Sequence, residues 1–120
     1  HGRLLTYTSD AISGFMQDME RIGRADDVTV MIFSEFGRRV PENTSLGTDH
    51  GAANNIFVVG KKIKGGHYGD LPSLTKLDAG DNLNFTTDFR RVYATMAEGW
   101  LGQKSAPVLN GVFQPFDMFA

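Results

Sequence analysis

Two short apolar runs constrain the fold more than any other feature of this sequence. "VTVMIF" covers Val28–Phe33 and "IFVV" covers Ile56–Val59, and both runs are rich in β-branched residues. Neither run alternates between apolar and polar residues, so both faces of each strand are expected to be buried. Strands that are covered on both faces are typical of a parallel sheet with helices on either side. The runs therefore predict two central strands of an α/β fold.

Two amphipathic segments flank these strands along the chain. Residues 8–22 carry apolar side chains at spacings of three and four, which predicts a helix with Ile12, Phe15, Met16, Met19 and Ile22 on one face. Thr8 or Ser9 is expected as its N-cap, and Gly23 as its stop. Residues 87–101 predict a second helix with a wider apolar stripe.

The elements follow in the order helix, strand, long loop, strand, long loop, helix. This alternation predicts an α/β layered architecture. Two strands are too few for a sheet covered on both faces, so either the loops contain further strands or the chain is part of a larger fold. Residues 1–120 are expected to form a single domain, and the apolar tail 103–120 to pack on its core or on a partner.

Composition excludes several classes of protein. The chain has no cysteine, which rules out disulfide scaffolds and thiolate metal sites. The formal charge of −2 argues against a nucleic-acid partner. No apolar stretch reaches the roughly 20 residues of a membrane helix, so no membrane contact is expected. No signal peptide is visible at the start, and the location of the protein stays open.

Polar residues that could carry chemistry follow the first predicted strand. Glu35 and Arg38 lie in "SEFGRR", directly after that strand. In open α/β sheets, ligands bind beyond the carboxyl ends of the strands. Arg38 could bind an anionic group through its fork of donors. Glu35 and Arg38 could equally form an ion pair over the edge of the sheet.

An acid–histidine pair, Asp49-His50, lies in the glycine-bracketed loop "GTDHG". A carboxylate and an imidazole together suit a divalent ion such as Zn²⁺ or Mn²⁺. A glycine-flanked Asp-His is also a common turn in which the aspartate accepts backbone hydrogen bonds. His67 is either a further ligand or a solvated loop residue. The nucleophile motif G-x-S-x-G is absent, as are the Walker A and Rossmann glycine patterns.

Several longer motifs occur together in a recognisable order. These are "VTVMIFSEFGRR", "GTDHGAANNIFVVGKKIKGG", "LPSL" and "TTDFRRVYATMAEGWLG". The combination resembles the C-terminal part of an uncharacterised bacterial family, the domain of unknown function 1501, over roughly residues 4–102. That family is related to sulfatases and to the alkaline phosphatase superfamily.

The resemblance implies a partial three-layer α/β/α sandwich with a mostly parallel sheet, as in the C-terminal half of alkaline phosphatase. Its relatives are metal-dependent hydrolases of phosphate or sulfate esters, and full-length relatives are exported, which implies the periplasm. Glu35, Asp49 and His50 become the candidate metal ligands for Zn, Mn or Ca. Arg38 becomes the candidate for binding a small anionic ester.

The sequence also departs from the pattern of these relatives. Two alignments to the relatives are possible. Matching letters makes Asp49-His50 the paired Asp-His motif. Matching topology, which the order strand–motif–loop–His–strand favours, puts Ser34-Glu35-Phe36-Gly37 there and makes His50 the later single histidine. Phe36 then stands where a metal-binding histidine would be, which weakens or removes one metal position. The early half of the superfamily domain, with its nucleophile, has no counterpart here, so the chain is expected to be a C-terminal fragment without catalytic residues of its own.

Two hypotheses about function follow. The first is a hydrolase-derived domain that lacks turnover on its own and retains binding of a divalent metal or an anion. The second is a non-catalytic assembly module that forms a homo-oligomer, since the open edges of a partial sheet pair with other chains.

Overall fold

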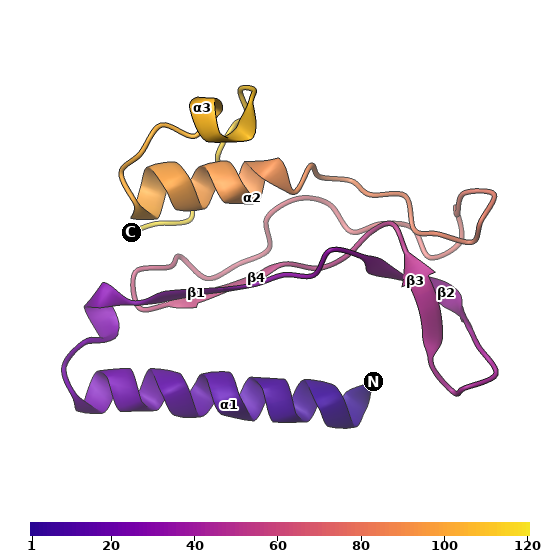
Figure 1. The fold of residues 1–120 in the computed structure, drawn as a ribbon, viewed down its shortest axis with the longest axis horizontal. Coiled ribbons are helices and arrows are strands. Elements are labelled where there is room, and N and C mark those ends of the chain that lie inside the picture. The colour runs from indigo at the N-terminus through magenta and orange to yellow at the C-terminus, as the bar shows by residue number, and fades with distance from the viewer.

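The computed structural model describes residues 1–120, which form a small set of helices and short strands around an open core (Figure 1). The elements in chain order are α1 (Gly2–Arg21), the 3₁₀ turn η1 (Ala25–Asp27), β1 (Thr29–Ile32), β2 (Gly37–Glu42), β3 (Thr48–Gly51), β4 (Phe57–Gly60), α2 (Arg90–Thr95), the π-helical turn η2 (Met96–Trp100) and α3 (Ala106–Leu109). None of the helices is long and apolar enough to cross a membrane.

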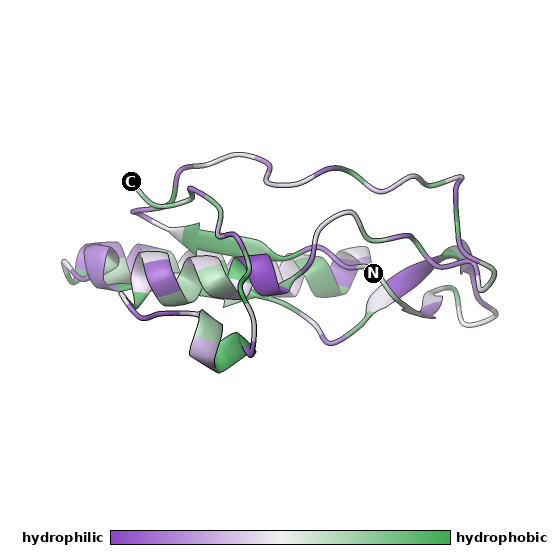
Figure 2. Ribbon diagram, turned by 90° about the horizontal axis from the view of Figure 1, so that it is seen from above, coloured by the Kyte–Doolittle hydropathy of each residue, from purple (hydrophilic) through white to green (hydrophobic).

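The strands form two separate antiparallel pairs, β1 with β4 and β2 with β3. The predicted partial α/β/α sandwich with a mostly parallel sheet is therefore wrong. The two apolar runs do form strands, β1 and β4. A strand without alternating polar residues can, however, pair in either direction, so the pattern did not determine that the pair is antiparallel. Here α1 lies on one side of the β1–β4 ribbon and α2 on the other (Figure 1). Seen from above, helices and strands overlap, as expected for stacked layers (Figure 2). The chain between the two strands folds back as a hairpin, so β4 returns antiparallel to β1.

Helix α1 begins at Gly2, several residues before the predicted start at residue 8. The hydroxyls of Thr8 and Ser9, which were expected to cap the helix, instead donate to backbone carbonyls in the preceding turn. Gly23 adopts a φ of 71°, which confirms it as the stop. No residue of α1 is fully buried.

The C-terminal tail lies along α2 and is held there by polar contacts. The hydroxyl of Thr95, on the last turn of α2, donates to the Arg91 carbonyl and accepts from the Phe116 backbone N–H, both in short bonds of 2.7 and 2.8 Å. The Arg91 guanidinium donates to the Gln114 carbonyl and lies 4.1 Å from the centre of the Phe116 ring. Helix α2 therefore serves as a platform for the tail.

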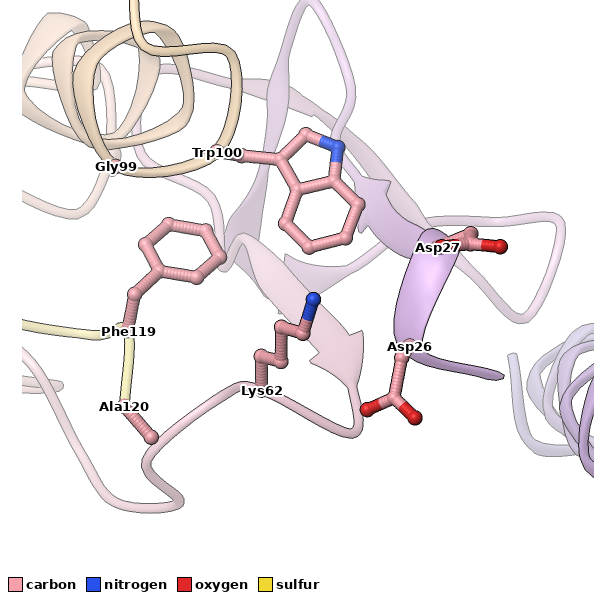
Figure 3. Close-up of a pocket in the computed structure, with 7 residues that line it drawn as sticks. All are labelled: Asp26, Asp27, Lys62, Gly99, Trp100, Phe119 and Ala120. Atoms are coloured by element: carbon pink, nitrogen blue, oxygen red, sulfur yellow. The ribbon is translucent and has the colours of Figure 1, made fainter. Parts of the chain in front are cut away.

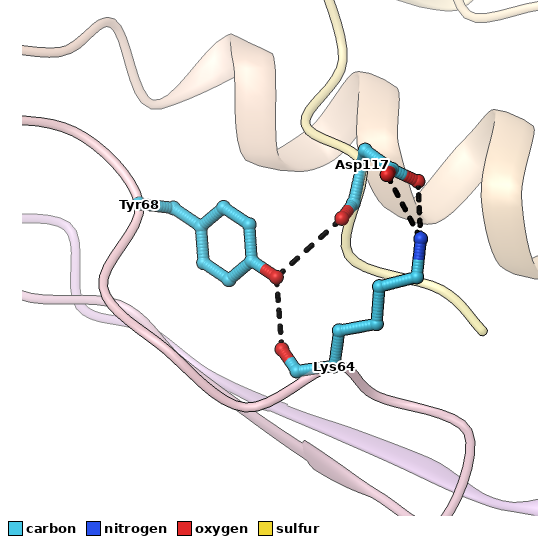
Figure 4. A network of polar contacts seen from close by, with 3 residues as sticks. All are labelled: Lys64, Tyr68 and Asp117. Atoms are coloured by element: carbon cyan, nitrogen blue, oxygen red, sulfur yellow. Dashed lines mark hydrogen bonds and ion pairs between the residues drawn. The ribbon is translucent and has the colours of Figure 1, made fainter.

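The tail also joins the segment that follows β4 (Figure 4). Lys64 Nζ lies 2.8 Å from both carboxylate oxygens of Asp117, and the Tyr68 hydroxyl donates to the Lys64 carbonyl at 2.8 Å. The Lys64 backbone N–H donates to the Met118 carbonyl at 2.7 Å, next to an isolated bridge between Ile63 and Phe119. The segment after β4 and the C-terminal tail are thus packed together.

The molecule is more open than a compact domain of its size. Only eight of the 120 residues are buried, and the accessible surface is 8684 Å². A compact monomer of 13.2 kDa is expected to expose about 6,400 Å². The radius of gyration is 16.4 Å, against about 14 Å for a compact chain of this length. A large part of the apolar surface is therefore left in contact with solvent.

Candidate functional site

The hairpin of β2 and β3 carries most of the side chains that the sequence singled out. Asn43 organises its turn, because its side-chain oxygen accepts from the backbone N–H groups of Ser45 and Gly47 at 3.0 and 3.1 Å. The Asn43 backbone N–H donates to the Gly47 carbonyl at 2.8 Å. The Asn43 side-chain amide also donates to Asp49 Oδ1 at 2.9 Å. Asp49 is thus part of the turn-stabilising network.

Two glycines allow the base of the hairpin to form. Gly37 and Gly51 are directly opposite each other in the antiparallel pair. A Cβ atom on Gly37 would lie 1.5 Å from the carbonyl oxygen of Ala53, which is backbone and cannot move aside. A Cβ atom on Gly51 would lie 2.6 Å from the carbonyl carbon of Arg38. Because the two backbones approach so closely, Phe36 and Arg38 come within contact distance of β3.

Arg38, Phe36 and His50 form one cluster at this base, which we call the hairpin cluster. Arg38 is directly opposite His50, so both side chains leave the same face of the pair. The rings of Phe36 and His50 stack with centroids 3.7 Å apart and planes inclined by 15°. The Arg38 guanidinium lies 5.1 Å from the Phe36 ring centre and donates to the Thr48 carbonyl at 2.8 Å.

The structure does not gather the predicted metal ligands. Asp49 and His50 are neighbours on a strand, so their side chains point to opposite faces. Glu35 is exposed, and its one side-chain contact is a long hydrogen bond of 3.5 Å from Ser34. No group of three or more histidine and carboxylate side chains is arranged to hold a metal ion. Binding of Zn, Mn or Ca through Glu35, Asp49 and His50 stays a prediction.

The hairpin cluster borders a cleft that the sequence reasoning missed. The cleft has a volume of about 720 Å³ and runs between β4, the long loop after it and α2. Arg38 and His67 both line it, together with the large, exposed side chains of Phe57, Leu71 and Phe85. Leu71 and Phe85 stand singly in the long loop between β4 and α2, so no periodic pattern in the sequence could have placed them beside Phe57 of β4.

A second, smaller pocket of about 420 Å³ lies where the chain end meets η1 and η2 (Figure 3). Trp100 and Phe119 stack in it with ring centroids 5.9 Å apart, and Lys62 Nζ lies 5.7 Å from the indole centre. Gly99 is required beside them, because a Cβ there would lie 2.3 Å from the Phe119 ring. Asp26 at its rim is already paired with Lys61, at 3.0 Å.

Two carboxylates outside these pockets are tuned by their hydrogen bonds. Backbone and side-chain donors of Asn82, together with the Gly80 N–H, lower the pKa of Asp78 below its ordinary value. A side-chain hydrogen bond from Arg90 lowers the pKa of Asp88, and the same bond raises the pKa of Arg90. Both carboxylates stabilise local turns, since their partners lie only two to four residues away.

Comparison with known sequences places this geometry in context. Residues 1–99 match the family described as Protein of unknown function (DUF1501). No curated protein matches the sequence, and no solved structure matches it either. The match confirms the predicted resemblance to this family. It does not extend to sulfatase-like enzymes or the alkaline phosphatase superfamily, nor to a particular part of a longer domain.

Proposed function

Because this chain belongs to the family of proteins of unknown function DUF1501, we propose its function from its own geometry: it is a non-catalytic assembly module that associates with further copies of itself. The observation that carries this proposal is the accessible surface of 8684 Å², which exceeds that of a compact monomer by about 2,300 Å².

The size of this excess fits a permanent interface. A standard protein–protein interface buries about 800 Å² on each partner, and obligate interfaces bury roughly 1,000–2,500 Å² on each. Burial of apolar area stabilises a complex by about 25 cal/mol per Å², of which a large share offsets the loss of rigid-body freedom. Burial of an area near the upper end of the obligate range gives a favourable free energy of association after that loss is subtracted.

The apolar character of the exposed surface supports the same proposal. Helix α1 carries an apolar stripe, and yet Leu4 is 69% exposed and Leu5 65%; Ile22, directly after the helix, is 53% exposed. Isolated helices with such a stripe are stabilised in proteins by packing that face against another surface. Large exposed apolar patches mark interaction sites rather than ordinary surface, and the apolar face of α1 is the candidate for such a patch.

The mass of the protein in solution tests the proposal. Light scattering across a hundredfold range of concentration is expected to give a multiple of the 13.2 kDa chain mass. The paired substitutions Leu5→Ser in α1 and Ile22→Ser at its C-cap, which remove exposed apolar side chains, should weaken association. The matched control is Gln17→Ser, which changes a polar side chain of the same helix. A stable monomer of the unaltered chain at the highest concentration contradicts self-association.

A second function, binding of a small anion, is favoured by the hairpin cluster. Arg38 has no carboxylate within ion-pair distance, and contacts with Phe36 and the Thr48 carbonyl hold its guanidinium in place. An immobilised, unpaired guanidinium beside an imidazole suits the planar, two-oxygen recognition of a phosphate or sulfate group. The position of Arg38 at the mouth of the cleft gives the organic part of an ester a place to lie.

Calorimetric titration with phosphate, sulfate and phenyl phosphate tests the anion site. The variant Arg38→Gln should lose binding, whereas Arg39→Gln, its exposed neighbour, should keep it. Titration with Zn²⁺, Mn²⁺ and Ca²⁺, repeated with His50→Ala, tests the predicted metal ligands. No turnover of phosphate or sulfate esters is expected with any of these ions, since the chain offers no activated nucleophile. If titration of Arg38→Gln with the anion still gives heat of binding, the anion binds at another site.

A further inference from the structure

We propose that residues 111–120 form a strap that closes one side of the cleft beside α2, is fastened by the ion pair of Lys64 and Asp117, and opens as a unit while the rest of the fold stays intact. Such a strap controls access to the cleft, which neither self-association nor anion binding requires. It follows residues 1–99, the part of the chain that matches the family.

The strap supplies one wall of the cleft. Phe116 and Met118 line the cleft from the strap, and Lys64 and Tyr68 line it from the segment after β4. Met118 is 6% exposed and is the one buried residue of the strap. Lys64 and Tyr68 are also the residues whose side chains bind Asp117 (Figure 4). The contacts that fasten the strap therefore lie at the edge of the cleft itself.

A phenylalanine at every third position of "FQPFDMF" attaches the strap to the helical region. Each ring meets one side chain of α2 or η2: Phe113 meets Arg90, Phe116 meets Arg91, and Phe119 meets Trp100. The two guanidinium carbons lie 4.2 and 4.1 Å from the ring centres, and the third pair has its centroids 5.9 Å apart. Cation–π contacts at accessible sites are individually weak. The attachment is thus spread over several weak contacts rather than concentrated in a buried core.

The strap has the features of a segment that opens locally. Apart from the isolated bridge at Phe119, none of its residues belongs to a helix or a strand. Its one ion pair is accessible to solvent, since the side chain of Asp117 is 89% exposed. Segments with few buried apolar contacts open at a lower free energy than the core. Salt screens an exposed ion pair, so a higher ionic strength should favour the open strap.

Hydrogen exchange of the full, unaltered chain tests whether the strap opens as a unit. Three amides take part in its contacts with the rest of the fold: those of Phe116, Lys64 and Ala120, which donate to Thr95, Met118 and Lys62. The amide of Lys64 lies outside the strap, and yet its protection should equal that of the other two within about twofold. All three should exchange at least about tenfold faster than the hydrogen-bonded amides of β1 and β4.

The same amides report the effect of salt. Raising the ionic strength from about 0.01 M to about 1 M shortens the screening length from about 30 Å to about 3 Å. The three exchange rates should then rise together by about two- to fivefold, while those of β1 and β4 should not. Exchange of the three amides at the rate of β1 and β4, or at rates unrelated to one another, overturns the opening of the strap as a unit.

A thiol in the strap measures access to the cleft, because the chain has no cysteine of its own. Met118→Cys is labelled with iodoacetamide, a neutral reagent, with and without Lys64→Gln. Loss of the ion pair should speed labelling about two- to fivefold. Loss of a nearby positive charge by itself disfavours the thiolate and slows labelling, so a faster rate reports opening. The matched control is Lys61→Gln, which removes the ion pair with Asp26 and should leave the rate unchanged.

A labelling rate that neither Lys64→Gln nor salt alters overturns the ion pair as the fastening. If Met118→Cys loosens the strap by itself, labelling is fast in every variant, and the exchange rates of the unaltered chain then decide. Both measurements are made at one protein concentration without added ligand. Failure of self-association or of anion binding therefore leaves their outcome unchanged.

Discussion

The imidazole of His50 lies flat against the ring of Phe36, with the ring centroids 3.7 Å apart. In the topological match to the family, Phe36 stood out as the residue that weakens or removes one metal position. The structure gives it a different role, because it holds both His50 and the Arg38 guanidinium, whose central carbon lies 5.1 Å from the ring centre. Phe36 therefore holds the side chains of Arg38 and His50 in place rather than a metal ion.

Phe36→Ala should therefore loosen the base of the hairpin. Stacked ring pairs contribute about 0.5–1.5 kcal/mol beyond their buried area, and exposed cation–π contacts about 0.5–1 kcal/mol. We expect a loss of roughly 1–2 kcal/mol in the free energy of unfolding, measured by urea denaturation. Leu46→Ala is the control, since Leu46 is 82% exposed in the hairpin turn. Equal losses in the two variants would show that the stack contributes nothing.

The sequence predicted the position of the two apolar strands better than their direction or their burial, since the residues of β1 and β4 are half-buried or exposed. β-branched runs at 28–33 and 56–59 became β1 and β4 within about one residue at each end. The same runs could not reveal strand direction, because direction depends on how the intervening chain returns. Residues 33–56 return through a hairpin whose strands carry Gly37, Pro41 and Gly51. Residues of these types read as a loop when only local propensity is considered.

The Gly37 position tests whether the hairpin depends on a close backbone approach. A Cβ atom there would lie 1.5 Å from the Ala53 carbonyl oxygen, so Gly37→Ala must displace one of the two backbones. Overpacking of this kind costs about 1–3 kcal/mol, measured as the free energy of unfolding. Gly14→Ala is the matched control, because nothing lies within 4 Å of a Cβ at that helical position. That control should gain about 0.5–1 kcal/mol, and a neutral Gly37→Ala contradicts the predicted clash.

For the candidate site too, the sequence identified residues but not how all of them are placed relative to one another. Arg38 and His50 were singled out from the sequence, and the register of β2 and β3 brings them together. Asp49 was singled out with His50, but adjacent residues on a strand face opposite ways. That consequence follows only once the segment is known to be a strand. The sequence predicted a glycine-bracketed loop at this position, and a loop sets no such alternation of side chains.

Acid should weaken the turn that contains Asp78. Hydrogen bonds from Asn82 and Gly80 lower the pKa of this carboxyl below its ordinary value of 3.8. The folded protein therefore favours the ionised form. The resulting stabilisation is complete above the ordinary value and is lost as the pH falls through the lower pKa of the folded state.

Urea denaturation of the chain and of Asp78→Asn, over a range of pH, measures this effect. The variant should be less stable than the unaltered chain at pH 6, and the difference should vanish in strong acid, where both side chains are neutral. Asn82→Ala removes one of the donors and should shrink the difference. A gap between the two proteins that stays constant down to the lowest pH would refute the role of this carboxylate.

The hydroxyl of Thr95 connects α2 to the tail and offers the sharpest test of how the C-terminal region is held. Thr95 is 1% exposed, and its hydroxyl accepts the Phe116 backbone N–H at 2.8 Å. Thr95→Val keeps the shape of the side chain but leaves that N–H without its partner, which costs about 1–3 kcal/mol for a buried group. Hydrogen exchange at Phe116 should accelerate in the variant, in step with the fall in the free energy of unfolding. Thr44→Val, which alters an exposed hydroxyl in the hairpin turn, should change neither quantity. Unaltered exchange at Phe116 would mean that the tail is held by its aromatic contacts with Arg91 instead.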